Sequence, residues 1–212
     1  MTIDEDCKRG TPRRKAERPT EILHAAFEEF VLTGYAATRL EDVAARAGVT
    51  KGTIYFHFQN KENVFNQMVR ELSKPMHQRT QQFLDENQHC GIEFLSSYLD
   101  FSYAEVLEDR HAREILRLLI AEATRFPDLV DEHFQYVLHP VFMRLQQTLA
   151  DGVRDCRIRN TPAATCPDLL LSPMLALNVF LLVFADRKPI DPKKHLEAAK
   201  DLILYGLLPR KA

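Results

Sequence analysis

The spacing of apolar residues is the feature that most limits what this chain can fold into. Apolar side chains recur every three to four residues through almost the whole sequence, and no segment shows the clean two-residue alternation of a half-buried strand. The composition, with 7 glycines and no tryptophan in 212 residues, is ordinary for a helix-rich protein. The sequence therefore predicts an all-α fold.

Short helices are predicted near the N-terminus. The first runs from about Pro19 to Thr33, and Gly34 follows where a left-handed cap residue is wanted. The second begins after Thr38, which is expected to act as its N-cap, with Glu41 three residues later completing a capping box. Leu40, Val43, Ala44 and Ala47 are expected to form the buried face of this second helix.

A third and a fourth helix follow at once. Thr50 is expected to cap a third helix that ends near His57, and Asn60 to cap a fourth that begins at Lys61. Pro75 is expected to kink or interrupt that fourth helix, because proline lacks the amide hydrogen that a helix interior uses. These elements make a compact unit of about sixty residues.

The rest of the chain is also expected to be helical. Further helices are predicted near residues 91–108, 111–125, 127–153, 167–185 and 192–208, with a loop at 157–165. Pro127, Pro167 and Pro192 suit first helical turns, whereas Pro140 and Pro173 fall inside apolar runs and should bend their helices.

The third helix carries residues that suit a DNA groove. Ile54 and Phe58 fall together on a helical wheel and are expected to face the core. Gly52 and Phe56 then point the opposite way, so the backbone can approach DNA at Gly52 and Phe56 can pack on a thymine methyl group. This third helix of the chain would be the second helix of a helix-turn-helix, and in that motif the second helix enters the major groove.

The stretch ILHAAFEEFVLTGYAATRLEDVAARAGVTKGTIYFHFQNKENVF, within residues 16–72, resembles the TetR family of bacterial transcription regulators. A Gly-Tyr pair, a threonine three residues on, an AxxAGV turn, a G-T-x-Y-x-H-F helix and a following lysine carry the resemblance. It implies a DNA-binding domain at residues 16–76, a long fourth helix, and a helical ligand-sensing and dimerisation domain at 77–212. The expected DNA contacts are Thr38, Lys51, Gly52, Thr53, Tyr55, Phe56, His57 and Lys61.

Charge is distributed in a way that agrees with a DNA partner. Residues 7–61 hold 10 lysines and arginines against 6 aspartates and glutamates, whereas residues 62–212 hold 18 against 21. Residues 1–15 are predicted to form a basic arm, and the basic run from Lys8 to Arg18 is expected to reach phosphates or an adjacent minor groove.

The second domain is expected to hold a small, lipophilic effector. The segment LLIAEATRFPDLVDEHF resembles the regulatory half of the AcrR/AefR-like branch of the family. Aromatic residues with a few polar groups are typical of ligand cavities, although the same aromatics also suit an ordinary core. The candidate ligand-binding residues are Phe94, Tyr98, Phe101, Arg117, Glu122, Phe126, His133, Met174 and Asn178.

The resemblance also implies a homodimer formed by the last two helices. Leu196, Ala199, Ile203 and Gly206 to Leu207 make a stripe with small residues that would allow close packing against a partner. A dimer would place two recognition helices about one DNA turn apart, as a palindromic operator requires. Ligand binding is then expected to favour a conformation with wrongly spaced recognition helices, which releases the DNA.

Other classes of protein find less support in the sequence. Nucleophile-elbow, phosphate-loop and HExxH motifs are absent, so neither an enzyme nor a cofactor is expected. The four cysteines form no CxxC pair and His133 and His139 are poorly spaced for a shared metal, so no metal site is expected. A transcriptional activator and a DNA-binding dimer without effector remain open alternatives.

The location of the protein is also a matter of expectation. The N-terminus has no apolar signal segment, and the longest apolar stretch is interrupted by Ser172, Pro173 and Asn178. We therefore expect a cytoplasmic protein that is associated with the bacterial nucleoid and has no membrane partner.

Overall fold

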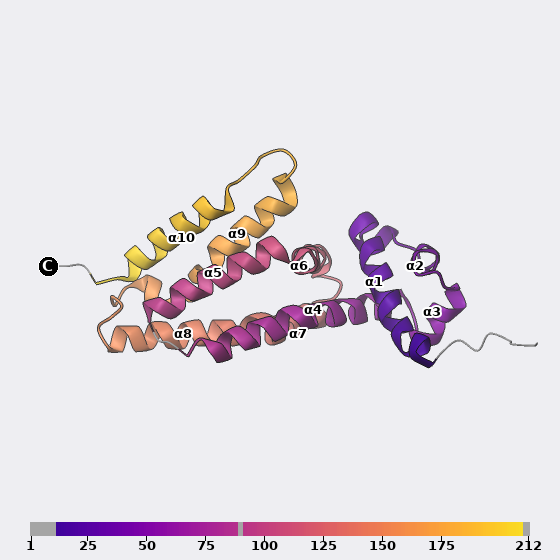
Figure 1. Cartoon of the computed structure of the whole chain (residues 1–212), viewed down its shortest axis with the longest axis horizontal. Coiled ribbons are helices and arrows are strands. Elements are labelled where there is room, and N and C mark those ends of the chain that lie inside the picture. The colour runs from indigo at the N-terminus through magenta and orange to yellow at the C-terminus, as the bar shows by residue number, and fades with distance from the viewer. Residues whose placement is uncertain (1–11, 89–90, 210–212) are drawn as a thin grey trace, which may run out of the picture. The chain divides into compact units, whose positions relative to one another are not determined.

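The computed structural model describes residues 12–88 and 91–209, and all regular elements in these ranges are helical (Figure 1). The all-α prediction is therefore confirmed. Contacts between Cα atoms divide the chain into two compact units, Met1–Glu71 and Leu72–Ala212. The boundary lies inside the fourth helix, a few residues before the expected end of the first domain at residue 76.

The first unit is built around the long helix α1. Ile22, Phe27 and Phe30 of α1 are fully buried, and the ring of Phe30 meets that of Phe65 edge-on at 5.1 Å between centroids. Burial of these large side chains stabilises the unit, at about 2 kcal/mol each. Its elements are α1 (Pro12–Ala37), α2 (Leu40–Arg46), α3 (Lys51–His57) and the first turns of α4 (Lys61–Glu86).

Helix α1 starts earlier than its sequence suggests. It begins at Pro12 instead of Pro19, and Pro19 lies inside it. Most of the expected basic arm, residues 1–11, lies outside the described residues, and the chain is already helical for the rest of it. Gly34 breaks the helix where predicted, but with φ 78° and ψ 162° it adopts an extended mirror-image conformation open only to glycine.

The capping predictions for α2, α3 and α4 are partly right. Thr50 Oγ1 accepts the amide hydrogen of Thr53 at 3.2 Å, and Asn60 Oδ1 accepts that of Asn63 at 2.7 Å, both as expected. The capping box at Thr38 is wrong, because the N-cap of α2 is Arg39 and makes no side-chain cap bond. Helix α4 also continues through Pro75 to Glu86 as one element.

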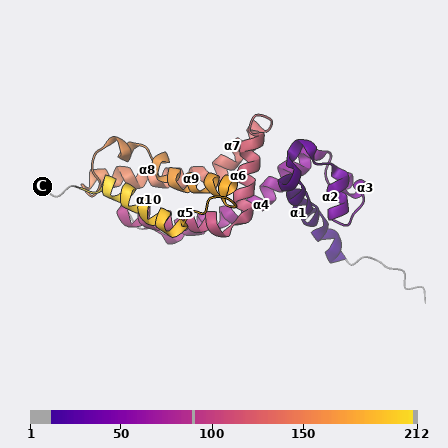
Figure 2. The ribbon, with the colours of Figure 1, turned by 90° about the horizontal axis from the view of Figure 1, so that it is seen from above.

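The second unit is a helical bundle. Helix α5 packs against both α9 and α10, as Figure 2 shows from above. Its core includes Phe94, Leu95 and Leu99 of α5, which are fully buried. Its elements are the end of α4, α5 (Ile92–Glu108), α6 (Arg110–Glu122), α7 (Pro127–His133), a π-helical turn η1 (Phe134–Leu138), α8 (His139–Arg154), a 3-10 turn η2 (Pro162–Thr165), α9 (Asp168–Phe184) and α10 (Pro192–Leu207).

The expected helix at 127–153 is divided by the π-helical turn. Pro140 has no amide hydrogen, so it cannot donate to the carbonyl of Tyr136 one turn before it. That carbonyl is instead 2.6 Å from Nδ1 of His77 on α4. Since a carbonyl can only accept, Nδ1 carries the hydrogen. This hydrogen bond links α4 to the π-helical turn η1.

Candidate nucleic-acid interface and interior cavity

Helix α3 has one exposed face, and its opposite face is buried in the core of the first unit. Ile54 is fully buried and Phe58 is 5% exposed, whereas Phe56, on the opposite side, is 83% exposed. The helical-wheel prediction for these three residues is confirmed. In both views α3 lies at the outer edge of the first unit (Figure 2). An aromatic ring this exposed on a short helix is available to a partner.

The expected contact residues of α3 gather around Phe56. Lys51, Gly52 and Tyr55 are exposed, and Thr53 and His57 are half-buried. The rings of Phe56 and His57 meet edge-on at 5.0 Å. A single face of α3 therefore offers a backbone without a Cβ, an aromatic ring and several hydrogen-bond donors, which are the groups that contact phosphates and base edges.

Lys51 is held by an acidic residue of the preceding helix. Its Nζ forms an ion pair with Glu41 of α2 and lies 5.6 Å from the centroid of the Tyr55 ring. The hydrogen bond to Glu41 raises the pKa of Lys51, and the same bond lowers the pKa of Glu41. Both side chains are exposed, so a phosphate can replace the carboxylate with little loss of free energy.

Thr38 and Lys61 are placed differently from the α3 residues. Thr38 is 3% exposed, and its hydroxyl donates to the carbonyl of Gly34 at 2.7 Å. It thereby holds the end of α1 against the start of α2, and its side chain does not face outward. Lys61 Nζ donates to the carbonyl of Ala36 at 3.0 Å and lies 4.6 Å from the Tyr35 ring centroid.

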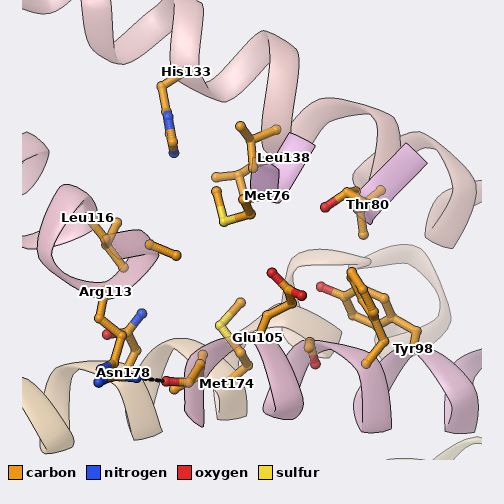
Figure 3. A pocket seen from close by; sticks show the side chains of 16 residues that line it. Met76, Thr80, Tyr98, Glu105, Arg113, Leu116, His133, Leu138, Met174 and Asn178 are labelled. Atoms are coloured by element: carbon orange, nitrogen blue, oxygen red, sulfur yellow. Dashed lines mark hydrogen bonds between the residues drawn. The ribbon is translucent and has the colours of Figure 1, made fainter. Parts of the chain in front are cut away.

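The second unit contains a mainly apolar cavity. The empty space at this site, together with the solvent at its open side, amounts to about 700 Å³. Figure 3 shows side chains converging on it from several helices. The lining residues are Met76, Thr80, Tyr98, Phe101, Ser102, Glu105, Val106, Ala112, Arg113, Leu116, His133, Val137, Leu138, Val141, Met174 and Asn178.

Five of the nine candidate ligand residues lie on this cavity: Tyr98, Phe101, His133, Met174 and Asn178. The structure places the other four elsewhere. Phe94 is buried in the core under the guanidinium of Arg144, 4.8 Å from its ring, and Phe126 is buried without lining the cavity. Arg117 pairs with Glu114 at 2.6 Å within α6, and Glu122 at the end of α6 pairs with Arg125 at 3.7 Å.

Sequence reasoning missed the cavity residues on α4 and at the α5–α6 junction. Met76 and Thr80 follow Pro75, where the helix was expected to bend or stop. Glu105 and Arg113 are ordinary charged residues by their sequence context. For Glu105 the only signal in the sequence is spacing, because it lies seven residues after Tyr98 and so on the same face of α5.

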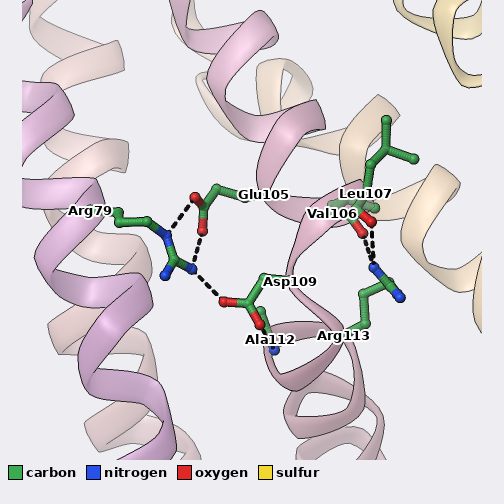
Figure 4. Close-up of polar contacts among 7 residues, drawn as sticks. All are labelled: Arg79, Glu105, Val106, Leu107, Asp109, Ala112 and Arg113. Carbon is green, nitrogen blue, oxygen red and sulfur yellow. Dashed lines mark hydrogen bonds and ion pairs between the residues drawn. The ribbon is translucent and has the colours of Figure 1, made fainter.

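A polar cluster joins α4 to the α5–α6 junction beside the cavity (Figure 4). Arg79 donates through Nε and Nη2 to the two carboxylate oxygens of Glu105, at 2.7 Å each, and through Nη2 to Asp109. Asp109 also caps α6, accepting from the amide of Ala112 at 2.9 Å. Arg113 Nη1 donates to two carbonyls at the end of α5, including that of Leu107 at 3.1 Å.

Charges within this cluster stabilise one another. The bidentate bond to Glu105 raises the pKa of Arg79. Burial acts to raise the pKa of Asp109, but the Ala112 amide and Arg79 outweigh it and hold that pKa below its ordinary value.

Burial of the His133 imidazole, which is 3.4 Å from Ser73 Oγ, lowers its pKa to about 4. His133 is therefore neutral near pH 7.

The last two helices carry apolar side chains on an outward face. On α9, Leu169, Leu175, Val179 and Val183 are between 42% and 48% exposed. On α10, Leu202 and Tyr205 are 76% and 73% exposed. Leu175, Val179 and Val183 follow one another every four residues, and Leu169 lies six residues before Leu175, so the four share one side of the helix.

The stripe that was expected to meet a partner subunit packs inward instead. Ala199 is 6% and Leu207 3% exposed, and both belong to the core beneath α10. Leu196 packs against the cluster that holds Ala199, and Ile203 against the cluster that holds Leu207, and both remain partly exposed. Ala199 and Leu207 are therefore used by the chain's own core, whereas α10 presents Leu202 and Tyr205 outward, and the dimer face stays a prediction.

Other kinds of site leave no trace in the described ranges. Residues 12–88 and 91–209 contain no group of three or more His, Cys, Asp or Glu that could hold a metal ion. Cys156 and Cys166 are free thiols, and Cys7 and Cys90 lie outside the described residues. Within the part of the chain that the structure describes, no helix is long and apolar enough to cross a bilayer.

Two family models match the chain. Residues 22–68 match the bacterial regulatory proteins of the tetR family, and residues 98–195 match the C-terminal domain of AefR-like transcriptional repressors. The first covers α2 and α3 with the parts of α1 and α4 that hold them. The second covers most of the cavity.

Comparison with individual proteins also points to HTH-type transcriptional regulators. The HTH-type transcriptional repressor KstR2 of Mycolicibacterium smegmatis is 34% identical over 147 residues, covering 67% of this chain and 70% of the relative. The uncharacterized HTH-type transcriptional regulator YhgD of Bacillus subtilis is 29% identical and covers 90% of this chain and 97% of the relative. The crystal structure of NalD, the secondary repressor of the MexAB-OprM multidrug efflux pump in Pseudomonas aeruginosa, superposes with a TM-score of 0.70 at 26% identity over 94% of this chain and 100% of that one.

These matches cover both units and agree with the exposed face of α3. The protein is a regulator and not an enzyme. The chain belongs to the TetR family of helix-turn-helix transcriptional regulators and has an AefR-like C-terminal domain.

Proposed function

We propose that this protein is a repressor that binds a palindromic operator as a homodimer and is released when a small, lipophilic molecule enters the cavity of the second unit. The observation that carries the proposal is the open face of α3, where Phe56 is 83% exposed among groups suited to DNA. The KstR2 relative, which is 34% identical, is described as a transcriptional repressor, and this supports repression over activation.

The proposed DNA contacts fall into two groups, those to phosphates and those to base edges. Lys51, Tyr55 and His57 carry donors that suit phosphates and would fix the helix in the groove. Gly52 allows close approach, and Thr53 and Phe56 are the side chains we assign to base edges. The buried Thr38 supports the turn and is left out of the proposed interface, and Lys61 contributes only if it exchanges the Ala36 carbonyl for a phosphate.

The cavity supports control by a ligand. Glu105 lines the cavity and also holds Arg79 of α4, the helix that begins in the DNA-binding unit. A ligand that displaces Glu105 or moves α6 would therefore alter the bonds made by α4. Such a ligand shifts the protein between two conformations by as much as its affinities for them differ.

Dimerisation is assigned to α9 and α10. Their outward side chains, such as Val179, Leu202 and Tyr205, are more exposed than apolar residues usually remain in a functional assembly. Pairing these faces between two chains would bury them and place two α3 helices on one duplex.

Operator binding is tested by selecting sites from random DNA. The full-length protein is incubated with a random duplex pool, and its affinity for the selected site is measured by fluorescence anisotropy at several salt concentrations. We expect a two-fold symmetric site, and we expect Lys51→Ala to weaken binding and reduce the salt slope by about 2, one for the lysine lost from each protomer. Lys193→Ala, an exposed lysine on α10, is the matched control and should change neither.

The mode of regulation needs a second readout. A reporter gene placed downstream of the selected site should be silenced by the protein and restored by a cavity ligand. Increased expression would show an activator, and silencing unaffected by any ligand that binds the protein would show a constitutive DNA-binding dimer. A selected site that ignores substitutions on α3 would contradict the proposed interface.

A further inference from the structure

Two buried polar side chains face the cavity without a hydrogen-bond partner. Asn178 of α9 is 5% exposed, and its Oδ1 accepts no hydrogen bond from any described residue. Tyr98 of α5 is 4% exposed, and its hydroxyl, which keeps some accessible surface, forms no hydrogen bond with any described residue. Burial alone raises the pKa of this tyrosine. Both residues line the cavity.

An unpaired buried polar atom such as Asn178 Oδ1 is rare in folded proteins, because it loses its hydrogen bonds to water and gains none. Leucine and phenylalanine would fill the same space without that loss. The two side chains are therefore best explained by a partner that enters the cavity, which is either water or part of a ligand.

The charged groups on the cavity wall, by contrast, have partners within the protein. Glu105 is held by both nitrogens of the Arg79 fork, and Arg113 donates to the carbonyls of Val106 and Leu107. The imidazole of His133 is neutral near pH 7. A charged ligand would have to break one of these pairs, whereas an uncharged ligand would leave them intact.

The two unpaired groups lie at opposite ends of the cavity. Figure 3 places Tyr98 and Thr80 on one side and Asn178 and Arg113 on the other. The α5 face between Tyr98 and Glu105 spans seven residues, or about 10 Å of helix at 1.5 Å per residue. Apolar side chains, among them Met76 and Met174, line the space between, and methionine adapts to many shapes.

We propose that the cavity takes an uncharged, elongated lipophile with a hydrogen-bonding oxygen near each end, one meeting the Tyr98 hydroxyl and the other the Asn178 amide. This inference deepens the proposed function, since it names the class of effector for the same cavity. The apolar middle supplies affinity, and the two polar ends fix orientation and length.

The test uses four probes of equal chain length with the full-length protein: decanediol, decanol, decanoate and decylammonium. Binding is measured by calorimetry without DNA. Decanediol should bind most tightly, decanol about five- to tenfold more weakly, and the two ions more weakly again. Tyr98→Phe and Asn178→Leu should each weaken decanediol by a similar factor and abolish its advantage over decanol.

A matched control separates the cavity from general effects. Tyr136→Phe removes the hydroxyl of a tyrosine that is 61% exposed and should leave decanediol binding unchanged. Asn178→Leu should also raise the melting temperature of the ligand-free protein by about 2–4 °C, because it removes an unpaired buried amide. A purely structural asparagine would give a lower melting temperature.

Several outcomes would overturn the inference. They are tighter binding of decanoate or decylammonium than of decanediol, decanediol affinity insensitive to both variants, and no binding of any probe up to its solubility limit. Anisotropy with operator DNA is measured separately. If decanediol binds as expected but DNA affinity does not change, the cavity assignment stands and ligand-controlled release fails.

Discussion

At the scale of single residues, exposure and pairing separate functional side chains from structural ones. Phe56 is an aromatic residue that folding alone would bury, yet it is 83% exposed beside polar neighbours. Thr38 is a polar residue that could have faced DNA, yet it is buried and bonded to the Gly34 carbonyl. The two belong to one motif and perform opposite tasks.

Substitutions on α3 should separate anchoring from base reading. Tyr55→Phe and His57→Ala each remove one phosphate donor and should weaken operator binding about three- to tenfold with little change in sequence preference. Phe56→Ala and Thr53→Ala should change the preferred base at one or two positions, with a loss of discrimination of about 1 kcal/mol. Repeating the site selection with each variant measures both effects. A selected sequence unaltered by all four changes would contradict the assignment.

His133 should make stability depend on pH. Its folded-state pKa of about 4 lies below the ordinary value of 6.5, so the unfolded chain binds the proton more readily. The folded state is therefore fully favoured above pH 6.5 and loses stability as pH falls toward 4, by up to about 3 kcal/mol. Melting curves of the protein and of His133→Gln across this range test it. Parallel pH profiles for the two would exclude a neutral, buried imidazole.

At the scale of helices, local signals and tertiary contacts compete at the element ends. Caps at Thr50 and Asn60 follow from sequence because the side chain and the amide it accepts are three residues apart. The π-helical turn after α7 does not, because it depends on His77 from a different helix filling the place of the amide that Pro140 lacks. Helix α4 makes further long-range bonds of this kind, through Arg79 to Glu105 and Asp109.

The Arg79 cluster should contribute to the stability of the second unit. Arg79→Gln leaves Glu105 and Asp109, whose side chains are 18% and 19% exposed, without their cation. Since Arg79 itself is 40% exposed, solvent screening limits the expected loss to about 1–2 kcal/mol. Urea denaturation measures it.

The matched control for this cluster is Arg154→Gln. Arg154 is 69% exposed in its pair with Asp151, so its loss should change stability by less than about 0.5 kcal/mol. A double-mutant cycle of Arg79→Gln with Glu105→Gln should give a coupling of about 0.5–1.5 kcal/mol. Equal effects for the two arginines would mean that the cluster is no more than a surface ion pair.

At the scale of the whole molecule, the chain holds two compact units, and the proposed palindromic operator would require two copies of it. The outward face of α9 is apolar at four positions, and α10 adds Leu202 and Tyr205. A stripe of this kind is open to solvent in a single chain, which favours pairing through these helices.

Charges introduced on α10 should break the dimer. Leu202→Glu combined with Tyr205→Glu should give a species of monomer mass in sedimentation experiments at micromolar concentration, because like charges would face each other across a two-fold interface. Operator affinity should fall in parallel. Leu32→Glu alters a residue of α1 that is 70% exposed and serves as the control, since it should keep the native mass. A variant that remains dimeric would move the interface elsewhere.

The sequence by itself determined the helical class, the helix-turn-helix and the inward and outward faces of α3, because periodicity, caps and glycine breaks act within a few residues of one another. Tertiary structure alone decided which residues form the cavity and which stripe of α10 is free. Arg117 and Glu122 had the right chemistry for a pocket but form ion pairs outside it, and Met76 and Thr80 line it because of where α4 meets distant helices. Ala199 and Leu207 looked suited to a partner and were used by the chain's own α5. The face of a helix that becomes buried depends on neighbours far away in the chain, and local patterns do not record them.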